Sequence, residues 1–412
     1  MVVNLLAILL LLAACVGSWV ALAAYVPSDW LAWSRVGMVG KLVLGLLVGY
    51  LYATVWGGGD TWQLHASGLE LLALAKADPI AFLQVPMMGA PSPDYLFHSE
   101  PRALFMAWLL VAPLVLSAQQ YYLAAIWVSL LGFWGLVFGL ASLKKLGWIQ
   151  GKALLVGVFL WPSVAFWSAG IMKETLVLGL VGMVVGATCS WLLGGKRSWL
   201  LVLVAAVCLV VLWQLKYYVA GLLFATLAAA VVGHWCKQRG VSRLWWVYSS
   251  VWVGGLLLAT LTYPALHPQH ILSALHENYE VFHNTSQSPQ VVYYPQWDGT
   301  LTGALLSVPK VFSVGMFLPL TADAWNVWSF LAGLENLMWM TLFVLVVLRL
   351  IRGYQGMFKV QLEPYQVSAL LFVVIALILI GLATPNLGTL LRYRVVYLPL
   401  AVAWVLSQLG VK

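Results

Sequence analysis

Residues 366–384, QVSALLFVVIALILIGLAT, contain no charged side chain. A helix needs about 20 apolar residues to cross the hydrocarbon core of a bilayer, so this stretch is long enough to span one. Similar stretches recur along the whole chain. They are continuous runs without a polar-apolar alternation, and a backbone in lipid must satisfy its own hydrogen bonds, so the sequence predicts membrane-spanning helices and an all-α fold.

The composition agrees with a membrane protein. Hydrophobic residues make up 63% of the 412 residues and charged residues only 8%, whereas a typical soluble domain has about 25% charged residues. We therefore expect a single transmembrane domain over residues 1–412, without a sizeable soluble part. The net charge of +8 comes from short basic clusters between apolar runs, which orient helices, so no nucleic-acid partner is expected.

Thirteen apolar segments are candidates for helices that cross or enter the membrane, and the expected number of spans is about eleven, in a range of ten to thirteen. They cover residues 2–25, 38–56, 103–116, 121–142, 153–170, 174–193, 198–215, 217–233, 244–262, 304–320, 331–350, 366–384 and 394–410.

Basic residues in short connections predict the orientation, because such residues favour the cytoplasmic side. The connections that we place inside contain Lys144, Lys145 and Lys152; Lys196 and Arg197; Lys237, Arg239 and Arg243; and Arg349, Arg352 and Lys359. Two longer acidic loops, 57–102 and 263–303, are then outside and contain interfacial helices. Segments 103–116 and 304–320 enter the interface without crossing, the N-terminus lies outside and the C-terminus inside.

Four cations on the predicted outer side are candidates for binding a lipid phosphate. Arg392 and Arg394 precede the last apolar segment, and guanidinium groups bind phosphate as planar donor forks; the alternative is that both reach lipid headgroups without a specific ligand. Lys173 stands beside Glu174 at the start of a segment, where the two neutralise each other or Lys173 faces a phosphate. Lys216, before two tyrosines, is a further candidate.

Asp60 is the candidate catalytic residue. It follows Gly57-Gly58-Gly59 at the end of an apolar segment, where a backbone bend places it at the membrane surface. A carboxylate there can act as a general base toward a hydroxyl group. The alternative is that Asp60 is the N-cap of a short amphipathic helix that continues through Glu70.

Other polar residues in the two outer loops are possible acceptor-binding or supporting residues: His65, Glu100 and Arg102 in the first loop, His276 and Trp297 in the second, and Glu174 at the segment start. Asp60, His65 and Glu70 match no metal-site spacing. We expect no metal and no cofactor, with a divalent ion as the less favoured alternative.

Two stretches resemble segments of bacterial membrane proteins that are associated with surface polysaccharides: Pro162-Ser163-x-x-Phe166-Trp167-Ser168-x-Gly170-x-x-Lys173-Glu174, and Arg392 to Pro399. With the outer-loop acid after a helix, the chain resembles the GT-C superfamily of polyprenyl-phosphate-sugar-dependent glycosyltransferases. Those enzymes commonly carry the acid after the first helix, whereas Asp60 follows the second apolar segment.

The resemblance implies a sugar transfer on the outer face of a bacterial inner membrane, from a lipid-linked donor to a hydroxyl on a glycan, lipid or protein acceptor. Asp60 would accept the proton, and Arg392, Arg394, Lys173 and Lys216 would stabilise the departing lipid phosphate. Besides the donor, membrane lipids are the expected partners.

Two other functions are open. An O-antigen or exopolysaccharide polymerase or ligase would use the same chemistry with a larger acceptor site. A non-enzymatic transporter or assembly subunit is expected to carry paired ionisable groups in its helix centres, whereas the predicted helix centres of this chain are nearly free of charge.

The predicted orientation can be measured by labelling single cysteines in a cysteine-free background. Positions in 57–102 and 263–303 should react with a membrane-impermeant maleimide from outside, and positions near Lys144 and Arg239 should react only after permeabilisation. Labelling of 57–102 only from the cytoplasm would contradict the predicted orientation and the mechanism with it.

Overall fold

The computed structural model describes residues 2–146, 151–193, 198–262, 266–286, 291–324, 326–352 and 364–411. These residues form helices joined by short turns and contain no strand, only an isolated β-bridge between Val291 and Asn386. The predicted all-α class is confirmed. Three basic residues of the predicted cytoplasmic connections lie outside the described residues: Lys196, Arg197 and Lys359.

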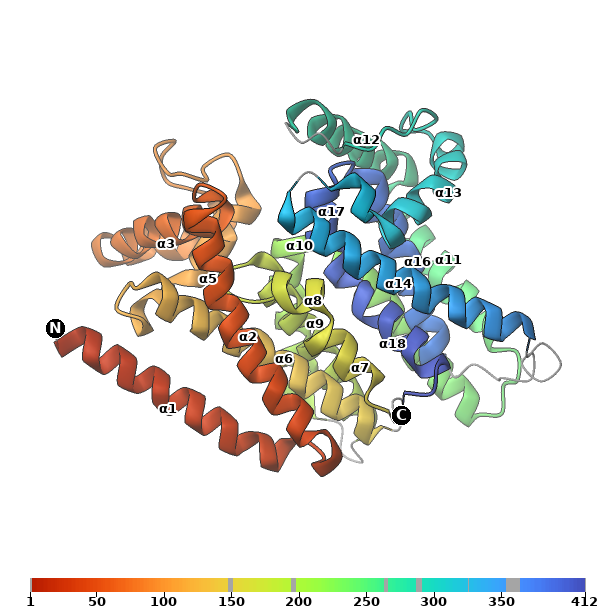
Figure 1. Cartoon of the computed structure of the whole chain (residues 1–412), viewed down its shortest axis with the longest axis horizontal. Coiled ribbons are helices and arrows are strands. Elements are labelled where there is room, and N and C mark those ends of the chain that lie inside the picture. Colours follow the sequence, from red (N-terminus) through yellow and green to blue (C-terminus); the bar gives the residue numbers. More distant parts are fainter. Residues whose placement is uncertain are drawn as a thin grey trace. The chain divides into compact units, whose positions relative to one another are not determined.

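The chain divides into two compact units, a division that hydropathy alone did not predict. Unit 1 comprises Met1–Gln150 and Val158–Ala220, and unit 2 comprises Gly151–Gly157 and Gly221–Lys412. The elements, shown in Figure 1, are α1 (Val2–Tyr25), α2 (Ser28–Thr54), α3 (Gly59–Ala77), α4 (Pro79–Met88), α5 (Pro101–Leu116), α6 (Tyr121–Lys145), α7 (Ala153–Leu155), the π-helix η1 (Val156–Leu160), α8 (Pro162–Trp167), α9 (Lys173–Leu193), α10 (Trp199–Gln238), α11 (Leu244–Thr262), α12 (Pro268–Thr285), α13 (Leu301–Phe317), η3 (Thr321–Asp323), α14 (Val327–Arg352), α16 (Pro364–Ala383), α17 (Leu387–Tyr393), η4 (Arg394–Val396) and α18 (Leu398–Gln408).

Seven helices in the described residues are long and apolar enough to cross a membrane: α1, α2, α6, α9, α10, α14 and α16. The number rises to eight if α17 to η4 and α18, which are bent by 68° at their junction, form one span. The chain is therefore a multi-pass helical membrane protein, and the expected count of eleven is not confirmed.

The difference in count has local causes. Segment 153–170 forms the short pieces α7, η1 and α8, whereas segments 198–215 and 217–233 continue as the 40-residue helix α10 with a non-helical backbone at Lys216. The two segments predicted to enter the interface without crossing, 103–116 and 304–320, form the 16-residue helix α5 and the 17-residue helix α13. Both long polar loops contain helices as expected, namely α3, α4 and α12.

One face of α2 packs against several other segments of unit 1. Gly37, Lys41, Gly45 and Gly49 recur every fourth residue and therefore lie in one row along the helix. The row contacts Phe159 at Gly37, Ser168 at Lys41, Gly170 at Gly45 and Tyr121 at Gly49. Small residues at this spacing let another backbone approach closely, as in many membrane helix pairs. In this protein the broken segment around α8 packs against the row.

Helices α6 and α9 form the closest helix pair. A Cβ atom added at Gly135 would lie 2.2 Å from the Gly179 carbonyl oxygen, and one added at Gly139 would lie 2.7 Å from the Gly182 carbonyl oxygen. The backbones touch directly, so van der Waals contact between them replaces side-chain packing.

Substitution of Gly135 by alanine should destabilise the protein by about 1–3 kcal/mol, because the added methyl group overpacks a backbone contact. Gly254 in α11 is the matched control, since an added Cβ there has nothing within 4 Å. The control gains only the helix propensity of alanine and should unfold at the same temperature or higher. Thermal unfolding in detergent compares the two, and equal midpoints would contradict the packing.

Candidate functional site

Asp60 lies on a sharp bend between a membrane-spanning helix and a helix too polar to be one. Gly57, Gly58 and Gly59 have φ values of +68°, +100° and +53°, a region that favours glycine. The Gly58 N–H donates to the Tyr52 carbonyl oxygen over 2.6 Å, so the chain doubles back on the end of α2. Helix α3 consequently turns away from α2 (Figure 1) and begins with Asp60 exposed in its first turn.

The N-cap interpretation of Asp60 is wrong. The N-cap of α3 is Gly58, and no side chain caps the helix. A carboxylate in the first turn is still favoured by the helix dipole. Helix α3 buries one face, but that face mixes polar and apolar residues, so the predicted amphipathic pattern is not confirmed: Thr61, Leu64, His65, Ser67, Gly68, Leu71 and Leu72.

Aromatic side chains surround the bend in unit 1. Tyr52 and Met172 are buried together, and Trp56 and Trp167 stack against each other with centroids 6.1 Å apart. Gly59 packs on the Tyr52 ring, where an added Cβ would come within 2.8 Å. The broken segment 162–172 therefore contributes directly to the surroundings of Asp60.

Lys216 does not face outward as a free phosphate ligand. Its ammonium lies 2.8 Å from a Glu174 carboxylate oxygen, and both side chains are buried. Glu174 is in the first turn of α9, and Lys216 interrupts α10 with φ −150° and ψ 84°. The predicted break at Lys216 is confirmed, and the Glu174 carboxylate is the partner that a buried ammonium group requires. A role of Lys216 in binding a lipid phosphate stays a prediction. Lys173, next to Glu174, is half-buried.

Lys41 is a buried cation that sequence reasoning missed, because it lies inside apolar segment 38–56. It occupies the middle of α2 and is 1% exposed. Its ammonium donates to the Ser168 carbonyl oxygen over 2.9 Å and also contacts the Ser168 hydroxyl. Ser168 is the C-cap of α8, so Lys41 satisfies a carbonyl group that a broken helix leaves without a partner.

The remaining first-loop residues have structural contacts. A His65 ring nitrogen lies 3.0 Å from the Gln119 carbonyl oxygen, and burial lowers the pKa of His65, which favours the neutral ring. Arg102 is exposed and places its guanidinium 4.4 Å from the Tyr217 ring centroid, a cation-π contact. Glu100 is the exposed N-cap of α5, without a side-chain capping bond.

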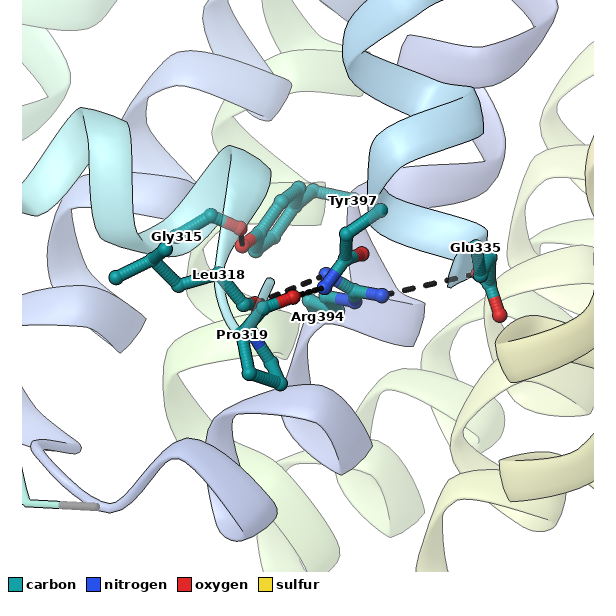
Figure 2. Close-up of polar contacts among 7 residues, drawn as sticks. Gly315, Leu318, Pro319, Glu335, Arg394 and Tyr397 are labelled. Atoms are coloured by element: carbon teal, nitrogen blue, oxygen red, sulfur yellow. Dashed lines mark hydrogen bonds and ion pairs between the residues drawn. The ribbon is translucent and has the colours of Figure 1, made fainter. Parts of the chain in front are cut away.

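In unit 2, Arg394 is buried at the start of η4, between α17 and α18, and Figure 2 shows its contacts with Glu335 and Leu318. It is 1% exposed, and its Nη2 lies 3.7 Å from a Glu335 oxygen of α14. Its Nη1 donates weakly to the Leu318 carbonyl oxygen over 3.5 Å, at the C-cap of α13. Arg394 is therefore buried beside a carboxylate and does not reach lipid headgroups, which was the alternative considered for it. Arg392 is half-buried, with its guanidinium 5.3 Å from the Tyr393 ring centroid.

The second loop is attached next to these arginines. The Val292 N–H donates to the Pro385 carbonyl oxygen over 2.9 Å, and the Asn386 amide donates to the Ser286 hydroxyl over 2.9 Å. Asn386 is also the N-cap of α17, the helix that ends at Tyr393. His276 and Trp297 are in this loop and lie in contact, with ring centroids 5.5 Å apart.

The predicted site residues thus fall into two groups. Unit 1 holds Asp60, His65, Glu100, Arg102, Lys173, Glu174 and Lys216, and unit 2 holds His276, Trp297, Arg392 and Arg394. A phosphate site shared by Lys173 and the two arginines stays a prediction. Within the described residues, no group of three or more His, Cys, Asp or Glu side chains is placed to hold a metal ion.

Fold and site together define a multi-pass helical membrane protein with buried cations at its helix breaks and an exposed carboxylate on a glycine bend. No protein-family model, curated protein or solved structure matches the chain.

The buried pair in unit 1 should be strongly coupled. Replacing Glu174 by glutamine leaves the Lys216 ammonium buried without its carboxylate, which costs about 3–5 kcal/mol of unfolding free energy. Adding Lys216→Met to Glu174→Gln removes the stranded charge and should recover most of that loss.

Thermal unfolding of the two single variants and the double variant measures this coupling. Asp29→Asn is a control from an ion pair whose carboxylate is half exposed, and it should cost at most about 1 kcal/mol. Additive losses at Glu174 and Lys216 would contradict the pair.

Proposed function

We propose that the chain is a membrane glycosyltransferase of GT-C type, which transfers a sugar from a polyprenyl-phosphate donor to a hydroxyl acceptor on the outer face of the membrane. The observation that carries the proposal is Asp60, an exposed carboxylate fixed by three positive-φ glycines at the end of α2. A base at the membrane surface is within reach of a lipid-linked headgroup and of an acceptor from outside.

In the proposed reaction, Asp60 accepts the proton of the acceptor hydroxyl. The hydroxyl oxygen forms a bond to the anomeric carbon, the bond from that carbon to the phosphate oxygen breaks, and the lipid phosphate leaves with both electrons. Lys173 is half-buried in unit 1, the unit that holds Asp60, and is the cation that we assign to the phosphate. Arg392, half-buried in unit 2, stays a predicted phosphate ligand. Lys216 and Arg394, which contact carboxylates, hold the broken helices that carry these cations.

The proposal includes the predicted topology of about eleven membrane passages, with 57–102 and 263–303 outside, in a bacterial inner membrane. Besides the seven long helices, the passages would be the broken segment around α8, the part of α10 after Lys216, α11, and the bent pair formed by α17 to η4 and α18. Helices α3 and α4 would lie along the outer interface.

A second candidate is a transporter or non-catalytic assembly subunit, and Lys41 favours it. A buried ammonium in the middle of a membrane helix is a common mark of substrate or ion pathways. However, Lys41 donates to a C-cap carbonyl group, which gives it a structural role. The glycosyltransferase is therefore our first proposal.

The test is transfer by purified protein from polyprenyl-phosphate sugars, followed as release of lipid phosphate. Asp60→Asn keeps the size of the side chain but removes the base, so transfer should fall by roughly 10²-fold or more while the protein still folds. Asp78→Asn is the matched control, because Asp78 is an exposed N-cap of α4 in the same loop and asparagine caps equally well.

Full activity of Asp60→Asn would eliminate Asp60 as the base. If the wild-type protein shows no turnover across a broad panel of donors and acceptors, the transporter or assembly subunit becomes the better proposal.

A further inference from the structure

The two helices at the start of the first loop expose different kinds of side chain. Helix α3 exposes charged, polar and small residues: Asp60, Gln63, Ala66, Glu70, Ala73, Lys76 and Ala77. Helix α4, which follows it directly, exposes four large apolar side chains, each between 65% and 82% exposed: Ile80, Leu83, Met87 and Met88. We call these four residues the α4 apolar face. Both helices belong to unit 1.

The opposite side of α4 is packed against the protein. The Trp108 ring of α5 stacks on Phe82 with centroids 5.6 Å apart, and its indole N–H donates to the Phe82 carbonyl oxygen over 3.0 Å. Val85, three residues after Phe82, is buried. Helix α4 is thus apolar on its packed side and on its exposed side. A helix of this kind needs apolar surroundings on both sides, because water on either one is unfavourable.

The α4 apolar face is continuous and uncharged. Ile80, Leu83 and Met87 recur at spacings of three and four residues, so they lie on one side of the helix. Gln84 is also exposed on this side, and its amide is polar but uncharged. The sequence of α4, PIAFLQVPMM, contains no charged residue.

The length and the ends of α4 determine how it can meet a membrane. A helix of 10 residues is about 15 Å long, about half the thickness of the hydrocarbon core. The Asp78 carboxylate caps its start by accepting from the Ile80 and Ala81 N–H groups, and Asp94 follows soon after its end. Carboxylates near both ends favour a helix that lies flat at headgroup level.

Lipid is the cover that fits this face. Unit 1 contains the membrane-crossing helices α1, α2, α6 and α9, so a bilayer surrounds the unit to which α4 belongs. A contiguous exposed apolar patch marks an interaction surface. Helices that lie in the membrane interface bury an apolar face about 5–10 Å deep, at the boundary between headgroups and acyl chains.

We propose that the α4 apolar face is immersed in the lipid leaflet on the side of loop 57–102, whereas α3 lies above that leaflet in contact with water. The inference rests on the proposed function only for the choice of leaflet, which is the outer one in that proposal. It goes further because it separates the two helices of the loop. Asp60, exposed on α3, is then open to an acceptor that arrives from the water.

The test measures the surroundings of nitroxide labels on single cysteines, in full-length protein without its native cysteines and at one copy per lipid nanodisc. Paramagnetic resonance compares collisions with oxygen, which concentrates in lipid, and with a water-soluble nickel chelate. The ratio of oxygen to nickel collisions should be several-fold higher for Leu83→Cys and Met87→Cys than for the controls Gln63→Cys and Ala66→Cys, which are exposed positions of α3.

Two results would overturn the proposal. Frequent nickel collisions at positions 83 and 87, as at the α3 controls, would mean that water covers the α4 apolar face. Few collisions with either reagent would mean that a protein surface covers it, whether from this chain or from a partner. All four positions are exposed, so the variants should unfold at the wild-type temperature. Ile80 and Met88 replace either α4 position if a label there prevents folding.

This inference and the proposed function can fail separately. Asp60→Asn should leave the collision ratios on α4 unchanged, because it removes a base and no apolar surface. An immersed α4 in a protein without transfer activity would refute the glycosyltransferase and keep the lipid contact. Transfer activity in a protein whose α4 is covered by water would do the reverse. Labelling of the α3 positions with an impermeant maleimide identifies the leaflet independently of both.

Discussion

An interrupted helix in an apolar environment leaves carbonyl groups without partners, and the structure meets that constraint with buried cations. Lys41 donates to the C-cap carbonyl of α8, and Arg394 donates to the C-cap carbonyl of α13. Lys216 is itself the interruption in α10 and is neutralised by Glu174. The charges that first suggest chemistry thus also make the broken helices possible, and these helices shape the surroundings of Asp60 and Arg392.

Much of the fold follows from the sequence, because apolar length and charge-free runs are local properties. The seven long apolar helices, the break at Lys216 and the helices inside both polar loops could be predicted on that basis, whereas the total number of spans could not. The ion pairs could not be predicted from the sequence, because their members are far apart in it. Glu174 and Lys216 are 42 positions apart, and Glu335 and Arg394 come from different helices. Lys41 could not be predicted as a buried cation, because one charged residue hardly changes the hydropathy of a long segment. Its partner is a backbone carbonyl group, which has no sequence signal.

The candidate site, too, could be predicted only in part from the sequence. Three consecutive glycines predicted the bend at Asp60, and the bend is present, but only coordinates reveal that Gly58 is the N-cap. Likewise, His276 and Trp297 became candidates for acceptor binding through their residue type alone, and only coordinates reveal that the two rings pack against each other.

The glycine contacts between α6 and α9 have a consequence for anything that enters unit 1 from the bilayer. The two backbones touch at Gly135 and Gly179 and again at Gly139 and Gly182, with no side chain between them that could rotate aside. An acyl or isoprenoid chain has no passage through that seam. Under the proposed function, the lipid tail of the donor has to approach the glycine bend along another face of the unit, because the seam between α6 and α9 is closed.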